Sequence, residues 1–221
     1  IVSVDDYGAA GDDTADDAAA INAADAAAAG GLVLFTPGKT YRCTSQLDCT
    51  GEWNLQGARI HMVLSGNVRG IEMDSNTWIH NGIIKKTGTG TISSGEYQCH
   101  IKAGDFNSPT GKENVRVNDL ILETAGTVTN SNGVVMATAT HNFVIENILA
   151  RETALLGRIV MCHWGNSANY ASTGTGHPHN GIIRNIYSEG MTLNSLATGV
   201  VYLSGTYGVV VEGVFSERCA Y

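Results

Sequence analysis

A long polar loop, which begins at His163 and ends at His179, holds the side chains best suited to ligand chemistry. It contains Trp164 and Tyr170, whose rings can stack on sugar rings, and a further histidine, His177. Imidazoles bind ligands and transfer protons near neutral pH, and long polar loops on a rigid scaffold often form binding sites. The alternative is a loop that only packs, with Trp164 covering the chain beneath it. His177 and His179 have no evident third ligand, so no metal site is predicted.

Two reaction schemes fit the charged residues near this loop. A glycosidase needs two carboxylates roughly 5–9 Å apart, and Glu189 is the candidate for one of them. A lyase needs a base for the proton beside a uronate carboxylate, and a cation that stabilises the resulting charge. His163 with Arg158, or with Arg184, meets that need. The candidate catalytic residues are therefore His163, Glu189 and Arg158, and the sequence does not choose between the schemes.

A second loop runs from Lys102 to Lys112 and carries Asp105 and Phe106. If the chain coils in register, this loop lies beside the first one. Lys102 and Asp105 then join Trp164, Tyr170 and His177 as candidate substrate-binding residues.

These loops need a scaffold, and short repeated apolar segments predict one. The copies read NVRVNDLI from Asn114, NFVIENIL from Asn142, NGIIRNIY from Asn180 and GVVVEGVF from Gly208, with a looser WIHNGII from Trp78. Their middle positions, spaced by 38, 28, 38 and 28 residues, are Asn81, Asp119, Asn147, Asn185 and Gly213. These residue types best tolerate a left-handed backbone, so each copy predicts a strand, a sharp bend and another strand. Further strands are expected at 134–137, 159–162 and 200–203, and together they form a stacked solenoid.

Charged residues recur at two positions of the repeat. One set is Glu146, Arg184 and Glu212, and the other is Glu123, Arg151, Glu189 and Glu217. Strands of neighbouring coils lie about 4.8 Å apart, so opposite charges support one another by about 0.2–1 kcal/mol per pair. A structural ladder is the favoured interpretation, although the same spacing also suits a pair of catalytic carboxylates.

The first forty residues predict a capping segment. A turn-rich stretch precedes a helix over residues 17–29, capped by Thr14 or Asp16, with Ala20, Ile21, Ala24 and Ala28 on one face. A short strand at 32–35 and a turn at Pro37 and Gly38 follow. A helix here can cover the open end of a parallel sheet, which would otherwise promote aggregation.

The strings DYGAAGDDTADDAAAINAA and GGLVLFTPGKTYR resemble the N-terminal signature of pectate-lyase-like β-helix proteins. The match covers about a fifth of the chain, and it departs from the family at Asp13, where glycine is common. The resemblance implies an all-β, right-handed parallel β-helix with an N-terminal capping α-helix. We expect one domain over residues 1–221, with a cap segment at 1–42 and coils at 43–221 that are truncated at the C-terminus.

The same resemblance implies binding and cleavage of polysaccharide by a lyase or glycoside hydrolase. Within the group, a phage tailspike-type depolymerase acting on capsule, O-antigen or polyuronate is favoured, because no leader is visible and the thiols are unpaired. Such tailspikes are usually homotrimers, and the expected location is extracellular or in the virion tail. A secreted polysaccharide lyase or polygalacturonase-like enzyme, and a non-catalytic receptor-binding or structural β-helix, are the alternatives.

Composition narrows the partners. The net charge of −8 argues against nucleic acid and anionic membranes, which need clustered Lys and Arg. No apolar stretch reaches the roughly 18 residues of a membrane span, and no cofactor is indicated. Cys43 and Cys49 are close enough in sequence for a small-loop disulfide, whereas Cys99 and Cys162 are interpreted as buried apolar residues.

Overall fold

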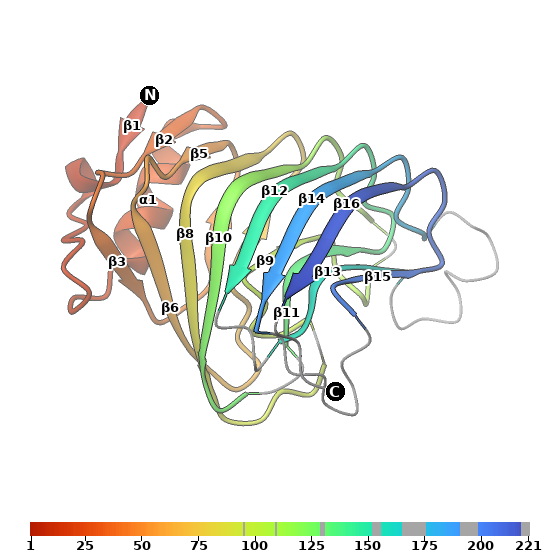
Figure 1. The fold of residues 1–221 in the computed structure, drawn as a ribbon. Coiled ribbons are helices and arrows are strands. Elements are labelled where there is room, and N and C mark those ends of the chain that lie inside the picture. Colours follow the sequence, from red (N-terminus) through yellow and green to blue (C-terminus); the bar gives the residue numbers. More distant parts are fainter. Residues whose placement is uncertain are drawn as a thin grey trace.

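The computed structural model describes residues 1–94, 96–108, 110–128, 131–151, 156–164, 176–190 and 199–217. The chain is a right-handed parallel β-helix whose N-terminal end carries a short α-helix, as the sequence predicts (Figure 1). No described helix is both long and apolar enough to cross a membrane.

One parallel sheet has ten strands and forms the longer, bent face of the coil (Figure 1). Its main path is β1 (Val2–Ser3), β2 (Leu32–Leu34), β5 (Glu52–Asn54), β8 (Trp78–Thr89), β10 (Arg116–Gly126), β12 (Val144–Arg151), β14 (Ile182–Glu189) and β16 (Val210–Glu217). Alongside this path, β3 (Thr40–Cys43) pairs with β6 (Arg59–Ser65), which pairs with β8.

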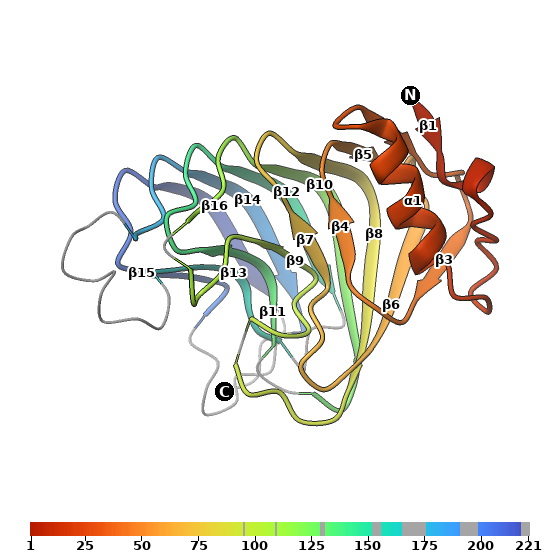
Figure 2. The same cartoon turned by 180° about the vertical axis from the view of Figure 1, so that it is seen from behind.

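The second parallel sheet has six strands and lies across the core from the first (Figure 2). In spatial order they are β4 (Leu47–Cys49), β7 (Ile71–Met73), β9 (Ile101–Ala103), β11 (Ser131–Ala137), β13 (Leu156–His163) and β15 (Val201–Ser204). Alternate side chains of both sheets point inward and form one hydrophobic core that runs along the coil axis.

The predicted bends are confirmed at every position. Positive φ angles of 60°, 54°, 56°, 54° and 63° occur at Asn81, Asp119, Asn147, Asn185 and Gly213. The side chains stack and bond from coil to coil: the Asn147 amide donates to Asp119 at 2.8 Å, and the Asn185 amide donates to Asn147 at 2.9 Å. The bend residues therefore stabilise the stack as well as the local backbone.

Replacing Asn147 by alanine is expected to lower the free energy of unfolding by about 2 kcal/mol, because it loses the ladder hydrogen bonds and because alanine tolerates left-handed backbone less well than asparagine. Asn147→Gly loses the same hydrogen bonds, but glycine adopts left-handed backbone readily, so the free energy of unfolding should fall by only about 1 kcal/mol. Urea unfolding of both variants measures the difference. An equal loss in both would contradict the conformational role.

Helix α1 (Ala18–Ala28) covers the N-terminal end of the stack (Figure 2). Ile21 and Ala24 enter the core, and the buried Asp25 carboxylate accepts hydrogen bonds from Thr50 and from the Trp53 indole at 2.6 Å. A 3-10 helix, η1 (Val4–Tyr7), precedes it. The N-cap residue is Asp17, and not Thr14 or Asp16 as predicted, although the Asp16 carboxylate accepts the Ala18 N–H of the first turn at 3.2 Å.

Four cysteines, Cys43, Cys49, Cys99 and Cys162, are described, and all are buried free thiols. The proposed disulfide between Cys43 and Cys49 is therefore not formed. The interpretation of Cys99 and Cys162 as buried apolar residues is confirmed.

Candidate functional site

The outward side chains of the six-stranded sheet, one per coil, form a continuous row that reaches solvent only toward its ends, because Lys102, Val135 and Met161 are buried beneath other parts of the chain. The row consists of Asp48, Glu72, Lys102, Val135, Met161 and Tyr202, which pair in register. Their neighbours along each strand, such as Ile71 and Met73, belong to the core. The row is charged at the helix-capped end and apolar at the other.

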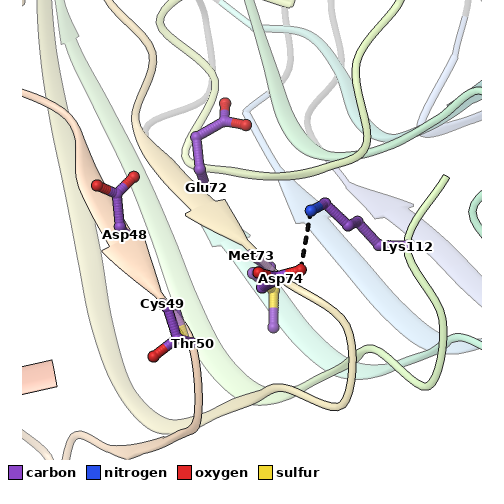
Figure 3. A pocket seen from close by; sticks show the side chains of 7 residues that line it. All are labelled: Asp48, Cys49, Thr50, Glu72, Met73, Asp74 and Lys112. Carbon is purple, nitrogen blue, oxygen red and sulfur yellow. Dashed lines mark hydrogen bonds and ion pairs between the residues drawn. The ribbon is translucent and has the colours of Figure 1, made fainter. Parts of the chain in front are cut away.

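An open pocket of about 330 Å³ lies over the charged end of the row (Figure 3). It is lined by Asp48, Cys49, Thr50, Glu72, Met73, Asp74 and Lys112. Asp48 and Glu72 come from paired strands and project to the same side of them. Three carboxyl groups from two adjacent coils thus share one cavity.

Glu72 is the carboxyl group that links this pocket to a buried ionic cluster. Its side chain is only 18% exposed, with Oε1 3.5 Å from Lys102 Nζ and 3.8 Å from Arg69 Nε. Burial raises the pKa of Glu72 to about 7, and the two cations only partly oppose that effect. Near neutral pH this group is therefore able to hold a proton and to donate it.

Beneath Glu72, the remaining charges of the cluster hold one another in place. The ammonium of Lys102, wholly buried, lies 3.0 Å from Glu96 Oε2. The Arg69 guanidinium is 2.6 Å from Asp105 and 3.6 Å from Glu96. Lys102 and Asp105, predicted to bind substrate, thus form ion pairs within the cluster. Lys102 contacts Glu72 and Glu96, and Asp105 contacts Arg69.

Asp74 is in the opposite electrostatic situation to Glu72. It is exposed, and its carboxylate accepts a hydrogen bond from Lys112 Nζ at 2.8 Å. This bond, with one from the Ser75 backbone N–H, lowers the pKa of Asp74 below its usual value. The pocket therefore contains one carboxyl group that still carries a proton in a large fraction of molecules near pH 7, and one that is ionised there.

Aromatic and cationic side chains gather at the other end of the row. The His163 ring lies 5.0 Å from Phe106, 5.7 Å from Trp164 and 6.3 Å from Tyr202. Arg158 lies over the Tyr202 ring, 4.4 Å from its centre. Burial, together with Arg158, lowers the pKa of His163, which favours the neutral imidazole.

The structure thus brings most of the sequence-predicted residues onto one sheet face. His163, Arg158, Trp164, Lys102 and Asp105 all lie on or beside the six-stranded sheet. His177 joins them, since its ring is 6.4 Å from that of Trp164. Phe106 of the second loop lies against His163, the residue from which the first loop leaves β13, whereas residues 165–175 of the first loop lie outside the described residues. Tyr170 lies outside the described residues.

Glu189 lies apart from this group, at the end of β14 in the ten-stranded sheet, in register with Glu217. The ladder interpretation of the repeated charges is confirmed for two pairs. Arg184 contacts Glu146 at 2.5 Å, and Arg151 contacts Glu123 at 2.5 Å.

Sequence reasoning missed the pocket carboxylates. A signal for them exists in three short segments, Leu47-Asp48-Cys49, Ile71-Glu72-Met73 and Ile101-Lys102-Ala103, each with one charged residue between two apolar ones. Such alternation predicts an outward charge on a strand whose neighbours are buried. The segments are too short to stand out without knowledge of the strand pairing.

The chain matches no protein-family model and no curated protein sequence. It is similar in structure to the Agl-KA catalytic domain, with a TM-score of 0.53, 16% identity, and coverage of 98% of this chain and 48% of that one. A 1,3-α-1,4-β-D-galactose-4-sulfate-3,6-anhydro-D-galactose-2-sulfate 4 galactohydrolase gives a TM-score of 0.47 and 16% identity, over 86% of this chain and 52% of that one. PfbA, a surface adhesin of Streptococcus pneumoniae, gives a TM-score of 0.47 and 17% identity, over 97% of this chain and 62% of that one. The chain spans about half the length of the first two, and the likeness shows a shared fold.

Proposed function

We propose that this protein binds polysaccharide in the open pocket at the charged end of its six-stranded sheet and hydrolyses a glycosidic bond there, beside Glu72. The observation that carries the proposal is the pairing, in one open cavity, of Glu72, whose pKa is raised to about 7, with Asp74, whose pKa is lowered. Environments that separate two carboxyl pKa values are what acid–base cleavage of a glycoside requires. The resemblance of the N-terminal segment to pectate-lyase-like proteins supports polysaccharide as the substrate class.

In this proposal Glu72 is the general acid. It donates its proton to the oxygen of the leaving sugar, while Lys102 and Arg69 hold its carboxyl group in position. Asp74, kept ionised by Lys112, accepts a proton from the attacking water. Asp48, one coil away in register with Glu72, binds sugar hydroxyl groups. At the far end of the row, Trp164 and Tyr202 offer aromatic surface to further sugar units.

A second candidate function is β-elimination at the apolar end of the row. It is favoured by the lowered pKa of His163, which keeps the imidazole available as a base, and by the nearby Arg158. In this scheme His163 removes the proton beside a uronate carboxylate and Arg158 stabilises the resulting charge. Glu189 remains a candidate only for a site on the other sheet.

Product analysis separates the two reactions. The protein is incubated with capsule, O-antigen and polyuronate preparations, and both new reducing ends and the ultraviolet absorbance of unsaturated ends are followed. Hydrolysis predicts reducing ends without unsaturation, which Glu72→Gln abolishes and His163→Ala retains. Unsaturated ends lost in His163→Ala would establish elimination instead. Binding without either product would indicate a non-catalytic receptor-binding protein.

We further propose a tailspike-type setting, with the protein acting outside the cell. Four buried free thiols support assembly in a reducing compartment before release, rather than oxidative export. The homotrimer that this setting implies is tested by light scattering of the purified protein. A monomeric mass would favour the secreted-enzyme alternative.

A further inference from the structure

The charge balance around the Glu72 pocket bears on the kind of sugar that can enter it. Five carboxyl groups, Asp48, Glu72, Asp74, Glu96 and Asp105, lie in the pocket or directly beneath it. Three cations, Arg69, Lys102 and Lys112, accompany them. The cluster is therefore net negative by two charges with Glu72 ionised, and by one with Glu72 protonated.

Each of these cations already contacts a carboxylate. Lys112 lies 2.8 Å from Asp74, Arg69 lies 2.6 Å from Asp105, and Lys102 lies 3.0 Å from Glu96. Lys112 is the one cation among the described residues that line the pocket. A sugar carboxylate or sulfate would have to compete with Asp74 for it.

An incoming anion would also meet like charge at short range. Asp48 and Asp74 are both exposed to the cavity. Like charges a few ångströms apart repel by an amount that grows as water is excluded, and a displaced Asp74 carboxylate would lose its partner. Sugar hydroxyl groups, in contrast, can donate hydrogen bonds to the same carboxylates at no electrostatic cost.

We propose that the Glu72 pocket selects an uncharged sugar unit, and excludes uronate and sulfated units from the cleaved position. This inference rests on the proposed hydrolytic function. It concerns the Glu72 pocket alone, because β-elimination of a uronate is assigned to His163 and Arg158 at the other end of the row.

Matched pairs of glycans provide the test. Polygalacturonate and alginate oligosaccharides are each compared with their carboxyl-reduced products, which keep the linkage and lose the charge. Binding is measured by calorimetry with Glu72→Gln protein, and reducing ends are measured with the unaltered protein. We expect the carboxyl-reduced member to bind at least about tenfold more tightly than the carboxylated one. This difference in affinity should become smaller as salt is added. Asp74→Asn should tighten binding of the carboxylated member several-fold because it releases Lys112, and the double variant Asp74→Asn, Lys112→Gln should not.

The outcomes distinguish the two proposals. Tighter binding and faster hydrolysis of the carboxylated member would overturn the uncharged substrate and leave hydrolysis standing. Cleavage of neither member would count against hydrolysis, while the binding ratio still decides the sugar class. Binding of neither member in either pair would contradict both.

Discussion

Glu72→Gln is expected to lower the rate of glycan hydrolysis by about 10²–10⁴-fold, the usual contribution of a general acid, while glycan binding stays within a few-fold. Glutamine keeps the shape and the contact with Lys102 but has no proton to donate at neutral pH. Initial rates of reducing-end formation, with binding measured separately by calorimetry, check this result. Glu113→Gln is the matched control, since Glu113 is an exposed carboxylate outside the pocket lining.

The pH dependence of the unaltered protein follows from the same group. Glu72 acts in its protonated form, so the rate should be high below its pKa and fall as the pH rises through about 7. Asp74 acts in its ionised form, and its lowered pKa moves the loss of rate on the acidic side below the usual range for aspartate. A profile that rises through pH 7 would contradict the assignment of Glu72 as the acid.

Lys86→Met is expected to stabilise the protein by about 3–4 kcal/mol at pH 7, because it removes an amine that is costly to charge in the core. Lys86 is wholly buried and contacts the Ser131 hydroxyl, and burial lowers its pKa to about 7. The unfolded chain binds this proton up to about pH 10.4, so the folded state is penalised at every pH below that value, most strongly below pH 7. The stability of the unaltered protein should therefore rise with pH between about 7 and 10 through this group.

The gain from Lys86→Met should shrink to below about 1 kcal/mol at pH 10, where the folded state is neutral at this position and the pH is close to the unfolded pKa of about 10.4. Urea unfolding at pH 7 and pH 10 measures both values. Lys85→Met is the matched control, because Lys85 is adjacent and only partly buried on the outer face. A gain that is equal at both pH values would mean that packing, rather than charge, is responsible.

The coil architecture was open to prediction because its bends depend on local backbone chemistry. Asn, Asp and Gly at a recurring position of a repeat predict left-handed backbone at that position. A second ladder carries the same signal, since positive φ angles occur at Asn76, Asn114, Asn142 and Asn180. The Asn114 amide donates a hydrogen bond to Asn76 at 2.8 Å. The residues that open the repeated segments thus form another column of bends.

The candidate site could be predicted only in part, because it depends on contacts between distant segments. Coils stacked in register were expected to bring the two loops together, and Phe106 of the second loop does lie 5.0 Å from His163, where the first loop begins. The pKa of Glu72 is raised by burial, with a smaller contribution from the charge of Asp105, and this burial comes from segments distant in sequence. The alternation of charged and apolar residues in the short strands predicts that the charges point outward. How deeply each charge is buried depends on contacts with distant segments.

The titration of the Glu72 carboxyl group is the most direct test of the account. In protein labelled with ¹³C at glutamate side chains, the Glu72 signal is assigned by its loss in Glu72→Gln and followed by NMR from acid to alkaline pH. The account predicts a midpoint near 7. A midpoint near the ordinary glutamate value of about 4.3 would show a group that is ionised at neutral pH and unable to act as the acid.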